Sequence, residues 1–170
     1  MQELLSEKDD TTNIKNIGKF LKNTSFQGAL YLNESKTGVE LLKSIKTAFP
    51  NTYIILDLWA TWCVPCINNM PHSKQLFQQV KDEKLPVVFV YLSTDVQSSE
   101  TLWQNKIAEL EQPGEHIFVQ NHQINELMDL FNTSGYPTYA IIKPNGQIDA
   151  KTINLNRKFS IEELKIYISQ

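Results

Sequence analysis

Two cysteines, placed between an apolar run and a helical pattern, constrain this chain more than any other feature. They are Cys63 and Cys66, and the chain has no others. Residues 53–58 form an almost unbroken apolar run, typical of a strand buried on both faces. Residues 67–81 then carry apolar side chains at helical spacing. Strand, Cys-x-x-Cys and helix in this order predict a thiol at a helix N-terminus, where free N–H groups and the helix dipole favour the thiolate.

The remaining sequence predicts an α/β fold, with a central mixed β-sheet flanked by helices on both faces. Strand and helix patterns alternate first, and a hairpin and a helix close the chain. Pro71 should kink the helix that follows the cysteines. We expect a peripheral strand at 26–32, further strands at 87–92, 138–142 and 147–153, a helix at 124–131, and helices capped by Thr37, by Ser98 or Ser99, and by Ser160.

Composition bounds the size and the kind of molecule. At 170 residues and 41% hydrophobic, the chain can bury one substantial core. We therefore predict a single domain over residues 37–170, after an N-terminal extension over residues 1–36 whose first 16 residues form a frayed arm or a short helix. A net charge of -3 argues against nucleic acid as a partner. No apolar run is long enough to span a membrane, and the first two dozen residues show no export signal.

Thiol–disulfide exchange is the chemistry that the cysteine pair favours. Cys63 lies at the expected mouth of the helix and should attack a substrate disulfide, and Cys66, one turn further, should resolve the mixed disulfide. A purely structural disulfide is the first alternative, but so small a loop restricts the unfolded chain little. A metal site would need further ligands. The three histidines have no ligand spacing to the cysteines, so we expect neither metal nor cofactor; they are His72, His116 and His122.

Asp57 interrupts the apolar run before the cysteines. Strand alternation places its side chain on one face with Ile55 and Trp59. A carboxylate there would lose hydration, which would raise its pKa and let it exchange a proton with the buried thiol. The alternatives are a carboxylate satisfied by local hydrogen bonds, or one that faces water. We favour proton transfer because the neighbouring residues are so apolar.

Several residues around the cysteines are candidates for contact with a substrate. Trp62 could form an apolar rim beside the thiol, whereas a core role is equally compatible with Trp59. Asp95 ends the second buried strand, where open α/β sheets often carry functional groups, although a loop or capping aspartate would look the same. From the sequence alone, the proline of Gly-Tyr-Pro-Thr is best read as an ordinary trans turn residue. The substrate-binding candidates are Trp62, Val64, Pro65, Tyr136 and Asp95.

These motifs together resemble the thioredoxin superfamily. Leu-Trp-Ala-x-Trp-Cys-x-Pro-Cys, a proline five positions after the second cysteine, Gly-Tyr-Pro-Thr and a late Asn-Gly turn occur in that family's order over roughly residues 52–170. The resemblance implies that Cys63 is the nucleophile, Cys66 the resolving cysteine, Asp57 a buried proton acceptor and Pro137 a cis-proline. It adds the backbone of Tyr136, exposed by a cis bond, as a donor and acceptor for an extended substrate segment.

Within the superfamily the chain looks most like the ResA/TlpA group of extracytoplasmic bacterial thiol–disulfide oxidoreductases, particularly forms common in Bacteroidetes. The long N-terminal lead-in and the insertion between Asp95 and Phe131 support that subgroup. Asp95 falls where some of these proteins carry an active-site glutamate. Val64 replaces the glycine of Cys-Gly-Pro-Cys, and Tyr91 stands where thioredoxins often have a lysine, so proton handling should differ here.

The sequence therefore predicts a monomeric dithiol–disulfide oxidoreductase that reduces protein disulfides and is recharged by a redox partner. Since no histidine lies between Cys63 and Cys66, we expect a reducing potential on the order of -270 mV. Its expected location, by resemblance alone, is extracytoplasmic, either periplasmic or membrane-anchored. A second hypothesis is a binding module that holds partners in a groove beside Pro137, with redox state as the switch.

Overall fold

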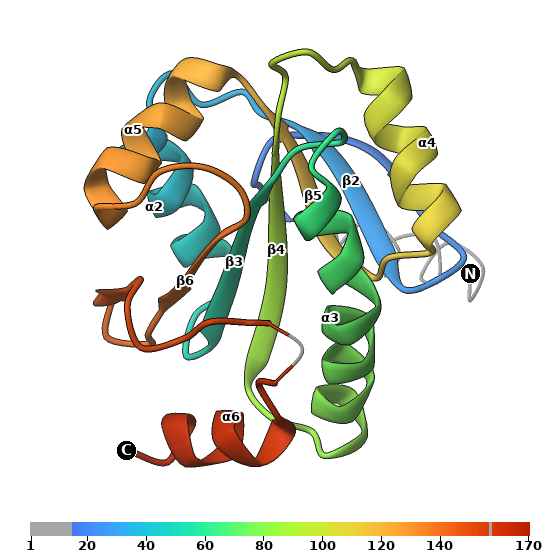
Figure 1. Ribbon diagram of the computed structural model, residues 1–170. Helices are drawn as coiled ribbons and strands as arrows, with labels where there is room; N and C mark the ends of the chain where they lie inside the picture. Colours follow the sequence, from blue (N-terminus) through green and yellow to red (C-terminus); the bar gives the residue numbers. More distant parts are fainter. Residues whose placement is uncertain (1–14, 157) are drawn as a thin grey trace, which may run out of the picture.

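The computed structural model describes residues 15–156 and 158–170, and these form one seven-stranded sheet with helices on both sides (Figure 1). The expected arm over the first 16 residues lies almost wholly outside this range. The strands are β1 (Lys19–Asn23), β2 (Gly28–Leu32), β3 (Tyr53–Trp59), β4 (Val87–Thr94), β5 (Gly114–Val119), β6 (Thr138–Ile142) and β7 (Ile148–Asp149). The helices are α2 (Gly38–Ala48), α3 (Val64–Asp82), α4 (Glu100–Leu110), α5 (Asn121–Phe131) and α6 (Ile161–Ile168).

The sheet is mixed, as predicted. Its strand order is β1-β2-β5-β4-β3-β6-β7. The inner strands β2, β5, β4 and β3 run parallel, and β1, β6 and β7 pair antiparallel at the two edges. In such a sheet the carboxyl ends of the parallel strands lie at one edge. The cysteine motif follows β3 at that edge.

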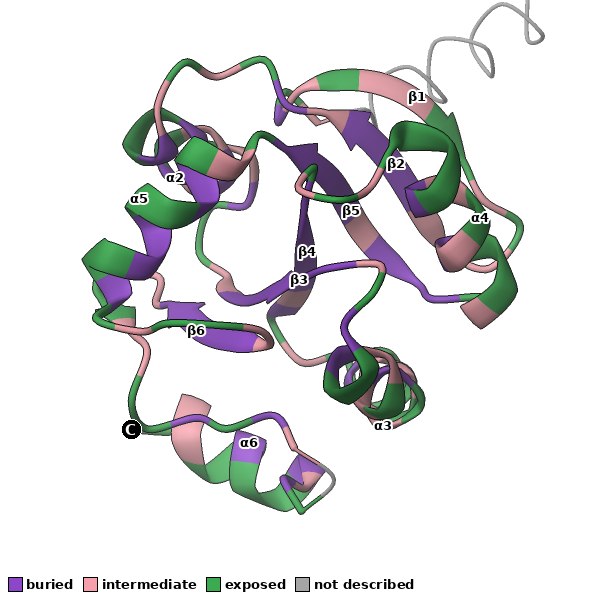
Figure 2. Ribbon diagram, turned by 45° about the horizontal axis from the view of Figure 1, so that its top comes forward, coloured by how far each residue is buried: buried purple, intermediate pink, exposed green. Residues whose placement is uncertain are grey.

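Two apolar cores form, one on each face of the sheet (Figures 1 and 2). Buried side chains of α3, α4 and α6 pack on one face, and those of α2 and α5 pack on the other. The strands between them are buried almost throughout, which explains why residues 53–58 and 87–92 read as continuous apolar runs.

Hydrogen bonds confirm all three predicted helix caps. Thr37 Oγ1 accepts from the Glu40 N–H of α2 at 3.1 Å. Ser99, rather than Ser98, begins α4 by accepting from the Leu102 N–H. Ser160 accepts from the Glu163 N–H in α6. Each side chain satisfies one of the N–H groups that a helix start leaves without a backbone partner.

Other predictions are wrong in detail. The strand expected at 26–32 begins at Gly28 and is not peripheral, because β1 covers its outer side. The sheet thus includes residues on both sides of the expected boundary at residue 36. The strand expected at 147–153 is only Ile148–Asp149. Strand β5 was not predicted, because its sequence begins with the polar run Gly-Glu-His. In the structure it pairs with β2 on one side and with β4 on the other.

Helix α3 continues without interruption through Pro71, so the kink expected there stays a prediction. Helix α4 ends at Leu110, before Pro113, because Glu111 adopts a left-handed conformation and closes the last turn with its own N–H. Within the described residues, no helix combines the length and the apolar character that crossing a membrane requires.

Candidate active site

The cysteine pair lies at the connection from the end of β3 to the start of α3, as the sequence predicted. Cys63 is the N-cap residue of α3, with extended backbone, and its sulfur accepts the Cys66 N–H at 3.2 Å. The two cysteines form a disulfide across Cα atoms 5.3 Å apart. Pro65 occupies the first turn, where a missing N–H costs no helical hydrogen bond. The arrangement supplies a sulfur atom held at the positive end of a helix dipole.

The electrostatic setting at this helix start favours a thiolate. Residues 64–67 include no acidic side chain, so nothing in the first turn competes for the helix N-terminus. Cys63 keeps 4% of its surface exposed in the disulfide form, and Cys66 keeps 1%. Cys63 is thus the more exposed of the two, as expected for the attacking cysteine, and Cys66 the more buried, as expected for the resolving one. Their catalytic roles remain a proposal.

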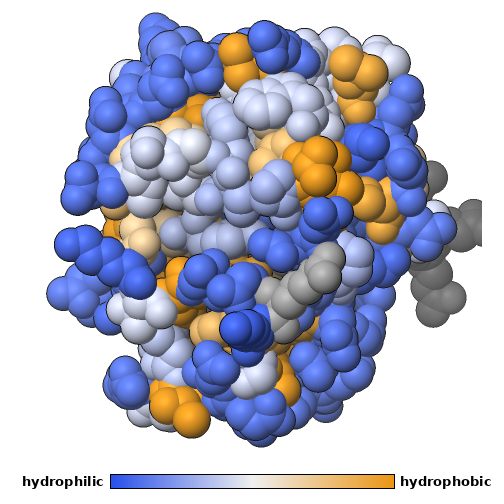
Figure 3. Space-filling model, in the orientation of Figure 1, coloured by the Kyte–Doolittle hydropathy of each residue, from blue (hydrophilic) through white to orange (hydrophobic). Residues whose placement is uncertain are grey.

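Exposed apolar side chains surround the small opening over Cys63. Trp62 is 47% exposed and Val64 64% exposed, and an apolar patch lies near the N-terminal end of α3 (Figure 3). The Trp62 indole N–H donates to the Val96 carbonyl at 3.0 Å, and its ring meets the Tyr136 ring edge-on at 5.8 Å. These contacts hold a rim of uncharged side chains around the disulfide.

The peptide bond between Tyr136 and Pro137 is cis, as the family resemblance implied and the sequence alone did not. Tyr136 reaches the rim through its contact with Trp62. A cavity of about 410 Å³ opens beside Pro137, lined by the end of the α5–β6 connection and by residues after β7. Space for an extended segment therefore exists next to the proline.

Asp57 is buried in β3, on the same face as Ile55 and Trp59, as strand alternation predicted. Burial raises the pKa of its carboxyl from 3.8 to about 8. Among the described residues, its Oδ1 atom has no hydrogen-bond partner. A carboxylate that simply faces water does not fit a side chain that is 4% exposed. A carboxyl with a pKa near neutrality can both take and return a proton.

Asp95 and Trp59 have evident structural tasks. Asp95 Oδ1 accepts the Asn121 N–H at 2.8 Å, at the start of α5, which leaves its contact with a substrate a prediction. Trp59 is completely buried in the core on the α3 face. The structure thus places Trp59 in the core and Trp62 on the rim.

The three histidines were considered as metal ligands. In residues 15–156 and 158–170, no three side chains of the metal-binding types His, Cys, Asp and Glu come together. His116 is fully buried in β5, where burial lowers its pKa to about 4. It stacks on Tyr91, with ring centroids 4.9 Å apart.

Two tyrosines lie beside Asp57, of which the sequence analysis pointed to Tyr91, by resemblance, and missed Tyr139. Tyr91 lies directly opposite Asp57 on β4, and Tyr139 lies directly opposite it on β6. Tyr91 was noted only as standing where a lysine is common, and Tyr139 was not singled out. Both tyrosines are paired with Asp57 across neighbouring strands. Strand register depends on residues far apart in the sequence, so no local pattern predicts this pairing.

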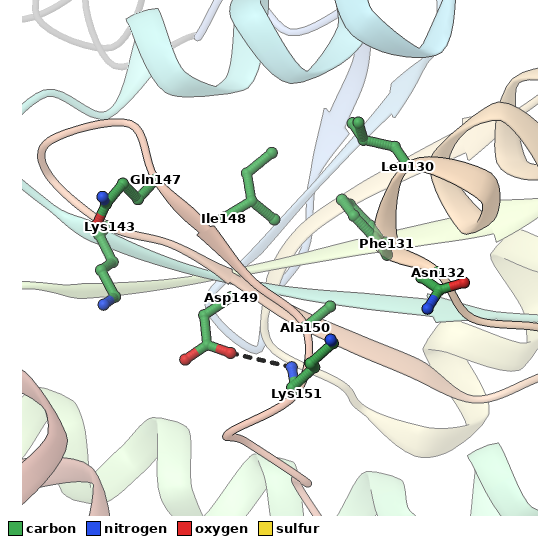
Figure 4. A pocket seen from close by; sticks show the side chains of 9 residues that line it. All are labelled: Leu130, Phe131, Asn132, Lys143, Gln147, Ile148, Asp149, Ala150 and Lys151. Atoms are coloured by element: carbon green, nitrogen blue, oxygen red, sulfur yellow. Dashed lines mark hydrogen bonds between the residues drawn. The ribbon is translucent and has the colours of Figure 1, made fainter.

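A larger cavity than the one beside Pro137 lies elsewhere. It measures about 650 Å³ and opens between the end of α5 and the β6–β7 hairpin (Figure 4). Leu130 and Ile148 face this space, while the Asp149 carboxylate turns away and accepts the Lys151 N–H. None of its lining residues belongs to the cysteine site.

Comparison with known proteins finds relatives by sequence and by fold. A family model described as thioredoxin-like matches residues 51–148, more than half of the chain. ResA thiol-disulfide oxidoreductase from Oceanobacillus iheyensis is 33% identical over 97 residues, which are 56% of this chain and 46% of that protein. ResA from Bacillus subtilis is 23% identical over 104 residues, 56% of this chain and 49% of that protein. The chain spans about half the length of these relatives.

Solved structures agree on the fold. The thioredoxin domain of a thiol-disulfide oxidoreductase from Bacteroides vulgatus superposes with a TM-score of 0.59 at 20% identity, over 72% of this chain and 83% of that one. StoA from Bacillus subtilis superposes with a TM-score of 0.53 at 18% identity, over 69% of this chain and 83% of that one.

Proposed function

Because the chain belongs to the thioredoxin-like family, we propose that it is a thiol–disulfide oxidoreductase that reduces protein disulfides through Cys63 and Cys66. The observation that carries the proposal is the position of Cys63 as the N-cap of α3, disulfide-bonded to the cysteine one turn further. The names of the ResA relatives support the same activity.

The reaction needs only the side chains of this site and a protein disulfide. In the reduced protein, the Cys63 thiolate attacks one sulfur of the substrate disulfide, and the other substrate sulfur leaves as a thiolate. Cys66 then loses its proton to Asp57 and attacks Cys63, which frees the second substrate thiol. The substrate gains two electrons, and the protein keeps the Cys63–Cys66 disulfide until a redox partner reduces it.

The substrate is proposed to bind along the uncharged rim and beside Pro137. Trp62, Val64 and Pro65 would contact the residues next to the substrate cystine, and the Tyr136 backbone would pair with an extended segment. Asp95 would add a further contact at the edge of this surface. We propose a reducing potential on the order of -270 mV, because the residues between the cysteines, Val64 and Pro65, carry no charge to stabilise the thiolate.

Reduction of insulin disulfides tests the activity. The wild-type protein, supplied with dithiothreitol, should accelerate insulin precipitation, and Cys63→Ser should reduce the rate to the uncatalysed level. Cys66→Ser is the matched control, since it keeps the attacking sulfur and should accumulate mixed disulfides. A wild-type protein that does not accelerate precipitation would refute the proposal, and a potential near -120 mV would refute its reducing direction.

The cavity beside Pro137 supports one other candidate function, a redox-switched binding module. Binding that depends on redox state but not on turnover would survive Cys63→Ser in a partner pull-down. Loss of partner binding in that variant would favour the enzyme.

As further proposals, we place the protein outside the cytoplasm, on the ResA/TlpA resemblance, and expect a monomer.

A further inference from the structure

Four polar side chains form a row across the middle of the sheet. Tyr139 of β6 lies opposite Asp57 of β3, Asp57 lies opposite Tyr91 of β4, and Tyr91 lies opposite His116 of β5. Directly paired residues project from the same face of a sheet. This is the face that α3, α4 and α6 cover, and Tyr91 and Tyr139 share its core cluster with Cys63 and Cys66 (Figures 1 and 2).

The whole row is buried. Polar groups in such a position cost free energy unless they are hydrogen-bonded, and a core built only for stability would carry apolar residues there. The mechanism proposed above uses Asp57 alone. The other three side chains therefore need a separate explanation.

The hydrogen bonds of the two tyrosines share one pattern. Tyr91 Oη accepts from Gln112 Nε2 at 2.9 Å and also interacts with the Ser73 hydroxyl. Tyr139 Oη accepts from Asn69 Nδ2 at 2.9 Å. A phenol has one hydrogen to donate and two lone pairs that accept. In these bonds with amide groups the tyrosines only accept, so each hydroxyl keeps a hydrogen with which to stabilise a negative charge between them.

Electrostatics ties both tyrosines to Asp57. Burial raises the pKa of Tyr91 and of Tyr139, and the negative charge of Asp57 raises both further. Because a tyrosinate would be repelled by the carboxylate, both phenols keep their hydrogen when Asp57 is ionised, and an O–H dipole near a buried carboxylate favours its charged form. His116, one strand beyond Tyr91, is neutral near pH 7 because burial lowers its pKa to about 4. Its stacked ring and its bond to the Gln112 carbonyl fix the far side of Tyr91.

We propose that Tyr91 is a positioning residue of the dithiol reaction, whose hydroxyl stabilises the ionised form of Asp57 and so sets the pH range of proton transfer from Cys66. Tyr139 supports the same charge from the opposite strand. This inference rests on the proposed function. Across the sheet Asp57 is paired with Tyr91 of β4 and with Tyr139 of β6, and both tyrosines share a core cluster with Cys63 and Cys66.

The step affected is the resolving one. Asp57 carboxylate takes the proton of the Cys66 thiol, and the Cys66 sulfur attacks the Cys63 sulfur. The bond between Cys63 and the substrate breaks, and the substrate sulfur leaves with the electron pair. Removing the Tyr91 hydroxyl makes the carboxylate less favourable, so Asp57 should hold its proton to a higher pH.

The pH profile of single-turnover disulfide reduction by the reduced protein tests this prediction. In Tyr91→Phe, the ring and its stack on His116 remain, and only the hydroxyl is lost. The midpoint of the profile should move up by about one pH unit, which lowers the rate about tenfold well below the midpoint. Tyr139→Phe should move it in the same direction, and serves also if Tyr91→Phe does not fold.

Two further variants make the test specific. Tyr31→Phe removes a buried phenol hydroxyl from the other face of the sheet, and should leave the midpoint unchanged. In an Asp57→Asn background, Tyr91→Phe should cause no further shift. Unchanged midpoints in both Tyr91→Phe and Tyr139→Phe, or an equal shift in the Asp57→Asn background, would overturn the inference. The proposed function would still stand in that case, because it fails only if the wild-type protein does not reduce disulfides.

Discussion

Replacing Asp57 by Asn should change how the stability of the oxidised protein depends on pH. Burial raises the pKa of the folded-state carboxyl to about 8, from 3.8 in an exposed chain. The folded protein therefore binds a proton that the unfolded chain releases at much lower pH. The contribution to stability is complete below pH 4, is lost as pH rises toward 8, and levels off above it.

The magnitude follows from the two pKa values. At pH 7 the wild-type protein should have lost roughly 4 kcal/mol of unfolding free energy relative to pH 3, and roughly 5–6 kcal/mol above pH 8. Asn carries no charge at either pH, so Asp57→Asn should not show this loss. The variant should gain stability relative to the wild type by these amounts as pH rises.

Urea unfolding of the oxidised protein, followed by tryptophan fluorescence from pH 4 to 9, measures the effect. Other titrating groups, including His116, remain in both proteins, so the difference between the two curves isolates Asp57. Asp129→Asn, at an exposed site on α5, controls for the chemical change itself. Parallel curves for the wild type and Asp57→Asn over this pH range would show that the reasoning about burial is wrong.

Three other changes test separate parts of the structure. Trp62→Ala removes a half-exposed rim side chain and should raise the KM for a protein disulfide, while the loss of its bond to Val96 and its contact with Tyr136 should cost only about 1–2 kcal/mol of unfolding free energy; an unchanged KM would contradict a substrate role. Leu41→Ala truncates a fully buried side chain of α2 and should cost about 2–5 kcal/mol by urea unfolding; a cost below about 1 kcal/mol would mean that the core collapses around it. Ser160→Ala removes the cap of α6 and should cost about 1 kcal/mol in the same assay, whereas no loss would mean that water replaces the cap.

Local patterns were sufficient for much of the fold and for the centre of the site. The apolar run before Cys63 and the helical spacing after Cys66 predicted the handover from strand to helix that positions the sulfur atoms. Asp57 stood out because a single carboxylate in a buried strand breaks the pattern. Thr37 and Ser160 were found as caps because capping depends on residues only three positions apart.

Features that depend on distant residues were not predictable in this way. Strand β5 mixes Glu115 and His116 with apolar residues, and only its neighbours β2 and β4 make it a central strand. The partnership of Tyr91 and Tyr139 with Asp57 depends on the register of three strands, which no single segment records. The cis bond before Pro137 came from family resemblance, because an X–Pro sequence alone favours trans.

The connection between β4 and α4 contacts the residues just before Cys63. Besides the bond from Trp62 to Val96, the hydroxyls of Thr61 and Ser98 lie 2.7 Å apart. This connection therefore holds the two residues before Cys63 in place through contacts from outside the motif. Substitutions at residues 96–98 should therefore alter the surface beside Cys63 without replacing either residue of the disulfide.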